Sequence, residues 1–238
     1  MKHPRLDISF IRTGAVALGI AATMPAAAQQ PLPERPRLVV GIVVEGLSDE
    51  YIDLLRSHFT DKGFRRLEEQ GLEITDMDFG TPLDGAAATA LIFTGASPSV
   101  NGVSAATVYD RELRRPRAVF HDPATIGNFT ETLSPKALGA STISDELRIA
   151  SGGLGYAYAL AANPSEAIAM AGHAGNSGFW INDNTGNWAT TTFYRDLPTR
   201  PQEVNRLTPL EYRLDTLSWV PSMAIDRYPD LPSYKKAY

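Results

Sequence analysis

The hydrophobic positions of this chain fall in short uncharged runs that are separated by polar segments containing glycine or proline. One run covers residues 38–44, contains four valines and no charged residue, and is followed directly by Glu45 and Gly46. An uncharged run of this length is typical of a strand buried on both faces of a parallel sheet. Residues 72–77 alternate apolar and polar positions, which predicts a second strand.

Four segments have the composition and the end signals of helices: residues 49–56, 61–70, 85–93 and 142–150. Gly71 follows the second segment in the position of a C-cap, and Gly95 begins the break after the third. Thr142 is the candidate N-cap of the fourth segment, and a Gly-Gly pair stops that helix. Strands and helices therefore alternate along the first half of the chain.

Further strands are predicted at residues 107–109, 117–120, 155–161, 179–181 and 188–194, and the chain becomes Pro-rich and irregular after residue 197. The first two strands and the last two are each separated by a turn-forming segment, so each pair is expected to form a hairpin. This order predicts an α/β fold with a mainly parallel sheet flanked by helices. Ligands of such folds bind at the carboxyl ends of the strands, where Glu45 is expected. A helix-capping role for Glu45 is equally compatible with its position.

Residues 1–28 have the three-part pattern of a cleavable signal peptide. Lys2, Arg5 and Arg12 precede an apolar run at residues 14–23, and small residues lead to a predicted cleavage site near Ala28. The run is shorter than the roughly 20 residues that cross a bilayer, although a weakly anchored helix is the alternative. Residues 29–37 are a Pro-rich linker. We therefore expect a periplasmic or secreted protein, whose lack of cysteine requires an ordinary core for stability.

The charge of the chain argues against some classes of partner. Removal of residues 1–28 changes the formal net charge from −5 to −7, because the segment carries three basic residues and one acidic residue. An acidic domain without a basic stripe is a poor candidate for binding nucleic acid or an anionic membrane. With 43% hydrophobic and 21% charged residues, the composition is that of a globular protein.

Several motifs occur in the order and spacing of one family. They are Pro36 to Glu45, Gly63 to Leu67 with Gly71, Phe93 to Gly102, Leu133 to Arg148, Ala171 to Ala174, and Trp180 to Trp188. Together these motifs resemble phosphodiesterase/nucleotide pyrophosphatase-type alkaline phosphatases, exported hydrolases of the alkaline phosphatase superfamily. The resemblance is collinear from residue 36 to about residue 195. It implies that residues 38–197 form the N-terminal half of an alkaline-phosphatase-like domain that is incomplete at its C-terminus. Residues 198–238 would then begin a cap or the missing second half.

The resemblance also implies a chemistry, which is zinc-dependent hydrolysis of phosphate esters by a Thr or Ser nucleophile at a helix N-terminus. The family's first metal-binding Asp falls on Glu45, and its nucleophile falls on Gly85. The Asn that contacts phosphate falls on Ala106, and the Lys and Arg that hold the substrate of monoesterases fall on Asn163 and Ser165. The chain is therefore expected to have no catalytic nucleophile, to retain Glu45 as its only metal ligand, and to bind zinc weakly or not at all.

Other side chains near these positions leave alternatives open. Asp84 precedes the lost nucleophile and could bind a cation or carry an aspartyl-phosphate role, although a carboxylate at a helix N-terminus is more often a plain cap. We take Asp84 and Asn163 as a candidate ligand pocket. His173 could be a metal ligand, but the family uses this histidine in a structural turn. His58 and His121 have no Glu or His at a metal-binding spacing.

The leading hypothesis is an exported, catalytically inactive member of this superfamily that takes a phosphorylated or other anionic small molecule as its ligand. One alternative is a non-enzymatic periplasmic binding or interaction module. The other is part of an active hydrolase whose second half supplies the remaining ligands. Half of a parallel sheet leaves an unpaired edge and an uncovered apolar face, which favours self-association or a partner that covers the missing half.

Overall fold

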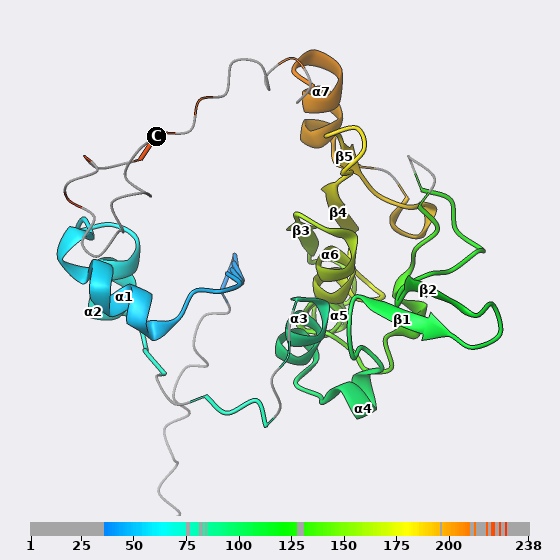
Figure 1. Ribbon diagram of the computed structural model, residues 1–238, viewed down its shortest axis with the longest axis horizontal. Helices are drawn as coiled ribbons and strands as arrows, with labels where there is room; N and C mark the ends of the chain where they lie inside the picture. Colours follow the sequence, from blue (N-terminus) through cyan, green and yellow to red (C-terminus); the bar gives the residue numbers. More distant parts are fainter. Residues whose placement is uncertain are drawn as a thin grey trace, which may run out of the picture. The chain divides into compact units, whose positions relative to one another are not determined.

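The computed structural model describes residues 36–74, 77–80, 83, 85–127, 131–195 and 197–209, together with residues 212, 218, 220, 221, 224 and 227. The chain divides into one unit, Met1–Ile42, and a second unit, Val43–Tyr238. Residues 36–42 of the first unit contain no helix or strand and are exposed. The helices and strands of the second unit are labelled in Figure 1.

Residues 38–44 are not the buried strand that their composition predicts. The exposed fraction is 78% for Leu38 and 79% for Ile42, and no described strand pairs with this run. The prediction was wrong because an apolar run shows only that residues can be buried, whereas a strand also needs a neighbour for its backbone hydrogen bonds. The predicted strand at residues 72–77 is wrong for the same reason, since Leu72 and Ile74 are exposed without regular structure; residues 75 and 76 lie outside the described residues.

The predicted helices are confirmed with small shifts at their ends. They are α1 (Asp49–Leu55) with the short 3₁₀ helix η1 (Arg56–His58), α2 (Phe64–Gln70), α3 (Gly85–Thr94) and α5 (Ile143–Ala150). Gly71 is the C-cap of α2 and Thr142 is the N-cap of α5, as predicted. The break that begins at Gly95 leads into a single turn, α4 (Pro98–Asn101), whose proline stands in the first turn, where it is tolerated.

The first predicted hairpin is also confirmed. Strand β1 (Thr107–Asp110) pairs antiparallel with β2 (Arg115–Ala118), and Arg117 Nε donates a 2.9 Å hydrogen bond to Asp110 Oδ2 across the pair. Hydrogen bonds from the backbone N–H groups of Leu113 and Glu112, and from the guanidinium of Arg117, lower the pKa of Asp110 despite some desolvation. The Asp110 carboxylate therefore stabilises the turn by accepting hydrogen bonds from the turn backbone and from Arg117 on the opposite strand.

A second sheet carries the parallel pairing that the alternation of elements predicts. Its strands β3 (Tyr158–Ala161), β4 (Ser177–Ile181) and β5 (Trp188–Ala189) lie in the order β3-β4-β5, with β3 and β4 parallel and β4 and β5 antiparallel. The crossover between the parallel strands contains α6 (Pro164–Ala171), which packs against both of them (Figure 1). The described residues thus form a βαβ unit followed by a hairpin, as expected of an α/β fold.

Small side chains allow the core helices to approach closely. Helix α3 packs against α6, and Ala86, Ala90, Ala167 and Ala171 are all buried within the core. Because alanine has no side chain beyond Cβ, the two helix backbones can lie near each other without a cavity. Trp180 of β4 is the largest fully buried side chain among the described residues.

The segment after residue 197 is not irregular throughout. It begins with helix α7 (Thr199–Leu207), which follows the 3₁₀ helix η3 (Thr192–Tyr194). Pro201 does not prevent this helix, because it stands in the first turn, where a backbone N–H has no partner within the helix. Another short 3₁₀ helix, η2 (Pro135–Ala137), precedes α5. No helix within the described part of the chain is both long enough and apolar enough to cross a membrane.

Candidate functional site

The predicted nucleophile position, Gly85, is the first residue of α3 and has a φ of +37°. A Cβ atom placed on Gly85 would lie 3.3 Å from Glu45 Oε1 and 3.4 Å from Glu166 Oε1. Two carboxylates from distant parts of the sequence therefore approach the start of this helix. The geometry thus brings Glu45 close to Gly85, although residues 38–44 do not form the strand that was predicted to position Glu45.

Asn163 lies beside the same point, as the N-cap of α6. Its side-chain oxygen accepts a 3.2 Å hydrogen bond from the backbone N–H of Glu166, and its Nδ2 donates a 2.7 Å hydrogen bond to Glu166 Oε1. An asparagine cap with an acidic residue three positions later resembles a capping box, although here the acidic side chain is bonded by the cap side chain rather than by the cap backbone. Asn163 thereby holds the Glu166 carboxylate in place next to Gly85.

Glu166 was not among the residues singled out from the sequence, although a signal was present. The order Asn-Pro-Ser-Glu at residues 163–166 combines an N-cap, a proline at the first helical position and an acidic residue in the first turn. These three signals predict the start of α6 and place Glu166 on its first turn. They do not predict that this turn faces Gly85, because that depends on how α3 and α6 pack.

The other residues of the predicted site are not all assembled around Gly85. Ser165 is buried in the first turn of α6, and Ala106 precedes β1, where its carbonyl accepts a 2.9 Å hydrogen bond from the backbone of Val119. Asp84, one half of the candidate ligand pocket, lies outside the described residues. The candidate pocket of Asp84 and Asn163 therefore stays a prediction.

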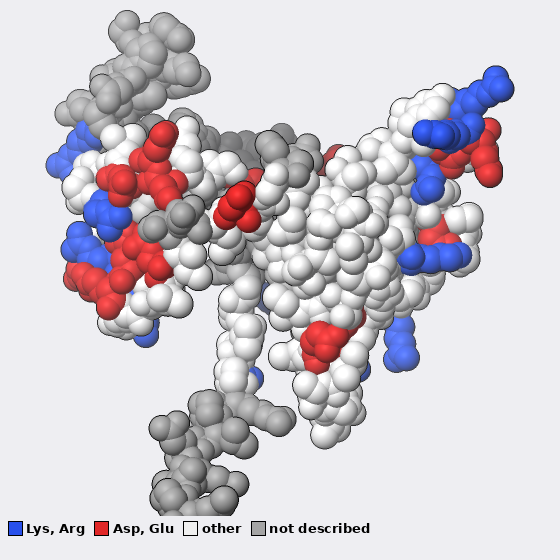
Figure 2. Space-filling model, turned by 90° about the horizontal axis from the view of Figure 1, so that it is seen from below, with Lys and Arg blue, Asp and Glu red and all other residues white. Residues whose placement is uncertain are grey.

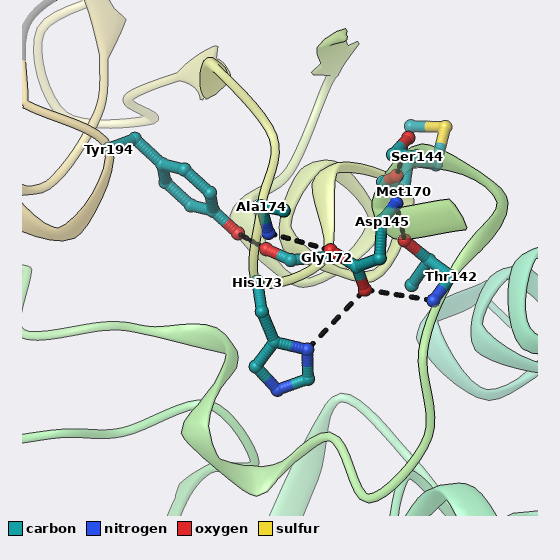
Figure 3. Close-up of polar contacts among 8 residues, drawn as sticks. All are labelled: Thr142, Ser144, Asp145, Met170, Gly172, His173, Ala174 and Tyr194. Atoms are coloured by element: carbon teal, nitrogen blue, oxygen red, sulfur yellow. Dashed lines mark hydrogen bonds and ion pairs between the residues drawn. The ribbon is translucent and has the colours of Figure 1, made fainter. Parts of the chain in front are cut away.

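His173 belongs to a polar network at the end of α6 (Figure 3). Its Nδ1 lies 3.4 Å from Asp145 Oδ2, and Asp145 also accepts hydrogen bonds of 2.8 Å from the backbone N–H of Thr142 and 2.6 Å from that of Ala174. Burial alone would raise the pKa of Asp145, but these hydrogen bonds outweigh it and the pKa is lowered. The carboxylate is thus held ionised by structural contacts.

Tyr194 completes this network from η3. Its hydroxyl donates a 2.7 Å hydrogen bond to the carbonyl of Gly172, and burial, together with the nearby charge of Asp145, raises its pKa well above 10.0. Gly172 has a φ of +65°, and a Cβ on it would lie 2.3 Å from Thr142 Oγ1. Only glycine fits this turn. His173 is the next residue and contacts Asp145, so its surroundings favour a role in the structure of the turn rather than in metal binding.

The described donors do not match a zinc site of the kind that the family resemblance implies. Zinc in catalytic sites is held by at least three protein ligands, with imidazoles or thiolates prominent among them. Two carboxylates approach Gly85, but His173 contacts Asp145, and His121 Nδ1 lies 3.0 Å from Thr132 Oγ1. Within the part of the chain that the structure describes, no three His, Cys, Asp or Glu residues are grouped to hold a metal ion.

Charged side chains are not gathered into a basic stripe on the face shown in Figure 2. Several of the Lys and Arg side chains on this face stand next to Asp or Glu. Arg56, for example, is within 2.9 Å of both Asp53 and Glu68.

Comparison with known proteins places these features in a family. The family model described as "Type I phosphodiesterase / nucleotide pyrophosphatase" matches residues 39–231. Alkaline phosphatase PafA of Elizabethkingia meningoseptica is 28% identical over 201 residues, which are 82% of this chain and 37% of the relative. Alkaline phosphatase PhoV of Synechococcus elongatus is 31% identical over 178 residues, which are 72% of this chain and 32% of the relative.

The fold agrees with the sequence comparison. The crystal structure of wild-type alkaline phosphatase PafA superposes with a TM-score of 0.75 at 27% identity, covering 82% of this chain and 39% of the solved one. The α/β fold class expected from the alternation of strands and helices is thereby confirmed. The chain spans between about a third and two fifths of the length of the relatives that it matches.

Proposed function

Because the chain belongs to the type I phosphodiesterase / nucleotide pyrophosphatase family, we propose that it is an exported member whose own residues do not carry out phosphate-ester hydrolysis. The observation that carries this proposal is Gly85 at the start of α3. The family resemblance places the nucleophile there, and glycine has no hydroxyl that could attack phosphorus.

The backbone of Gly85 supports the same conclusion. Its φ of +37° lies on the side of the Ramachandran plot that residues with a Cβ rarely adopt, so a Ser or Thr in this conformation would be strained. The side chain would also begin within 3.4 Å of Glu45 Oε1 and Glu166 Oε1. The local structure is therefore adapted to glycine, and replacing this one residue would not by itself restore a nucleophile.

The charges around Gly85 also disfavour hydrolysis by these residues. Substrate phosphates are stabilised by cationic side chains, by metal ions or by backbone N–H groups. Here two carboxylates approach the site, and the positions of the family's Lys and Arg hold Asn163 and Ser165. Because Glu166 is held by Asn163, its charge stays near Gly85 and repels a phosphate dianion.

Export is proposed from the N-terminal pattern. Basic residues, a short apolar run and three alanines ending at Ala28 are the features that a signal peptidase substrate needs. The expected mature chain begins near Gln29 and would act in the periplasm or outside the cell. Detection of a processed chain in the periplasmic fraction, with Gln29 at its N-terminus, would support this part of the proposal; retention of residues 1–28 would contradict it.

Hydrolysis assays test the central part of the proposal. The full chain, produced for export and purified, is assayed with an aryl phosphate and an aryl phosphodiester, with added zinc and with a chelator. Enzymes accelerate such reactions by at least about 10⁶-fold, so a working site is easily distinguished from background. We expect the same background rate for the wild-type chain and for Glu45→Ala. Zinc-dependent hydrolysis that is lost in Glu45→Ala would overturn the proposal and favour an active hydrolase.

A further inference from the structure

Helix α7 lies against strand β5, the last strand of the sheet β3-β4-β5 (Figure 1). Asn205 of α7 bonds both backbone groups of Trp188 in β5. Its Nδ2 donates a 2.8 Å hydrogen bond to the Trp188 carbonyl, and its Oδ1 accepts a 2.8 Å hydrogen bond from the Trp188 N–H. One side chain therefore joins the helix to the strand through two hydrogen bonds.

The two groups that Asn205 bonds belong to the outer side of β5. In an extended strand, the N–H and C=O of one residue point to the same side, and those of the next residue point to the other. Because both Trp188 groups bond Asn205, they point away from β4, with which β5 pairs on its inner side. A carboxamide offers a donor and an acceptor, as a peptide group does. Asn205 thus satisfies the groups that a further strand would otherwise pair with.

Helix α7 is held on the sheet with little burial of its side chains. None of its nine residues, all within the described part of the chain, is buried, whereas α6 buries Ala167, Ile168 and Ala171. Arg200 pairs with Glu203 inside α7, and this ion pair does not hold the helix on β5. Since apolar burial is the main stabilising contribution and a helix this short is marginal alone, the attachment of α7 depends strongly on Asn205.

We propose that α7 is a strap that opens and closes on β5 as one unit while the core stays folded, and that Asn205 closes it. Segments with few buried apolar contacts open at a lower free energy than the core does. In the closed state the outer groups of Trp188 are paired, and in the open state they can pair with another strand. This device is separate from the residues around Gly85 and does not depend on the proposed loss of hydrolysis.

Native-state hydrogen exchange of the full exported chain, followed residue by residue by NMR, tests the opening. We expect the N–H groups of Trp188 and of the last turn of α7 to be protected equally. Their protection should be lower by about tenfold or more than that of Gly172, whose N–H bonds the Ile168 carbonyl at the end of α6. Protection of Trp188 as strong as that of Gly172 would overturn the proposal, because β5 would then open only together with the core.

Two variants on α7 test the role of Asn205. Asn205→Ala removes both hydrogen bonds to Trp188, so the protection of the Trp188 N–H should fall about tenfold or more while that of Gly172 is unchanged. Glu203→Ala is the matched control: it loses only an exposed ion pair with Arg200 and should leave Trp188 as protected as in the wild type. Unchanged protection of Trp188 in Asn205→Ala would overturn the assignment of Asn205.

Sedimentation velocity over a range of concentrations tests what the strap prevents. With its outer groups unpaired, β5 of Asn205→Ala should associate with other copies, so this variant should self-associate more strongly than Glu203→Ala. Equal association of the two variants would overturn the role of Asn205 in closing the edge. If Asn205→Ala does not fold, the exchange of Trp188 and Gly172 in the wild-type chain still decides whether α7 opens by itself.

Discussion

The backbone N–H of Ala174 donates a 2.6 Å hydrogen bond to Asp145 Oδ1, although the two residues are 29 positions apart in the sequence. The other oxygen of this carboxylate accepts from the backbone of Thr142, which closes a capping box at the start of α5. One buried side chain thus joins α5 to the turn that follows α6. These contacts indicate that Asp145 and His173 stabilise the fold and do not belong to the group of residues around Gly85.

Replacing Asp145 should destabilise the fold strongly. Asp145→Ala removes the acceptor for the Thr142 and Ala174 backbone N–H groups at a buried position, so the free energy of unfolding should fall by about 2–4 kcal/mol. Urea unfolding followed by circular dichroism measures the change. Asp183→Asn, in the exposed turn after β4, is the control and should change stability by less than about 0.5 kcal/mol. An unchanged midpoint for Asp145→Ala would show that these hydrogen bonds contribute little.

Asp145 should also make stability depend on pH in the acid range. Its pKa in the folded protein is lowered below 3.8, so its contribution is fully present above the unfolded-state pKa of about 3.9 and is lost as pH falls through the folded-state value. The free energy of unfolding of the wild-type chain should therefore decrease between about pH 5 and pH 2. Asp145→Asn should show a shallower decrease in the same range. Parallel curves for the two proteins would refute this assignment.

The sequence predicts elements well where the signals are local. Thr142 with Asp145 three residues later predicts the start of α5, and an uncharged run around a polar turn predicts the β4–β5 hairpin. The prediction of a strand at residues 38–44 failed because their apolar composition does not say which strand would pair with them. Helix α7 was missed because the Pro-rich segment after residue 197 was interpreted as irregular, whereas Pro201 stands in the first turn of a helix, where proline is tolerated.

The residues of the candidate site also fall into those that the sequence predicted and one that depends on packing. Glu45, Gly85 and Asn163 were identified by the resemblance, and the structure brings them together. Glu166 was missed because its relevance depends on the packing of α6 beside α3, which no local pattern encodes. This missed residue changes the candidate site, since it places a second carboxylate next to Gly85.

Gly85 should be intolerant of a side chain mainly because of its backbone. Gly85→Ala is expected to lower the free energy of unfolding by about 1 kcal/mol, since φ is +37°. Gly46→Ala is the matched control, because Gly46 has a φ of +70° and nothing within 4 Å of its added Cβ. The two losses should agree within about 0.5 kcal/mol, since the atoms near Gly85 are the ends of flexible side chains. Full stability of Gly85→Ala would contradict the backbone argument.

Asn163 should act both as a helix cap and as the residue that positions Glu166, and two substitutions separate these roles. Asn163→Ser keeps an oxygen that can cap α6 but loses the 2.7 Å hydrogen bond to Glu166 Oε1, whereas Asn163→Ala loses both. The cap is worth about 1 kcal/mol, so Asn163→Ala should be less stable than Asn163→Ser by that amount in urea unfolding. Because the Glu166 bond is only partly buried, Asn163→Ser itself should lose about 0.5 kcal/mol. Equal stability of the two variants would mean that Asn163 does not cap α6.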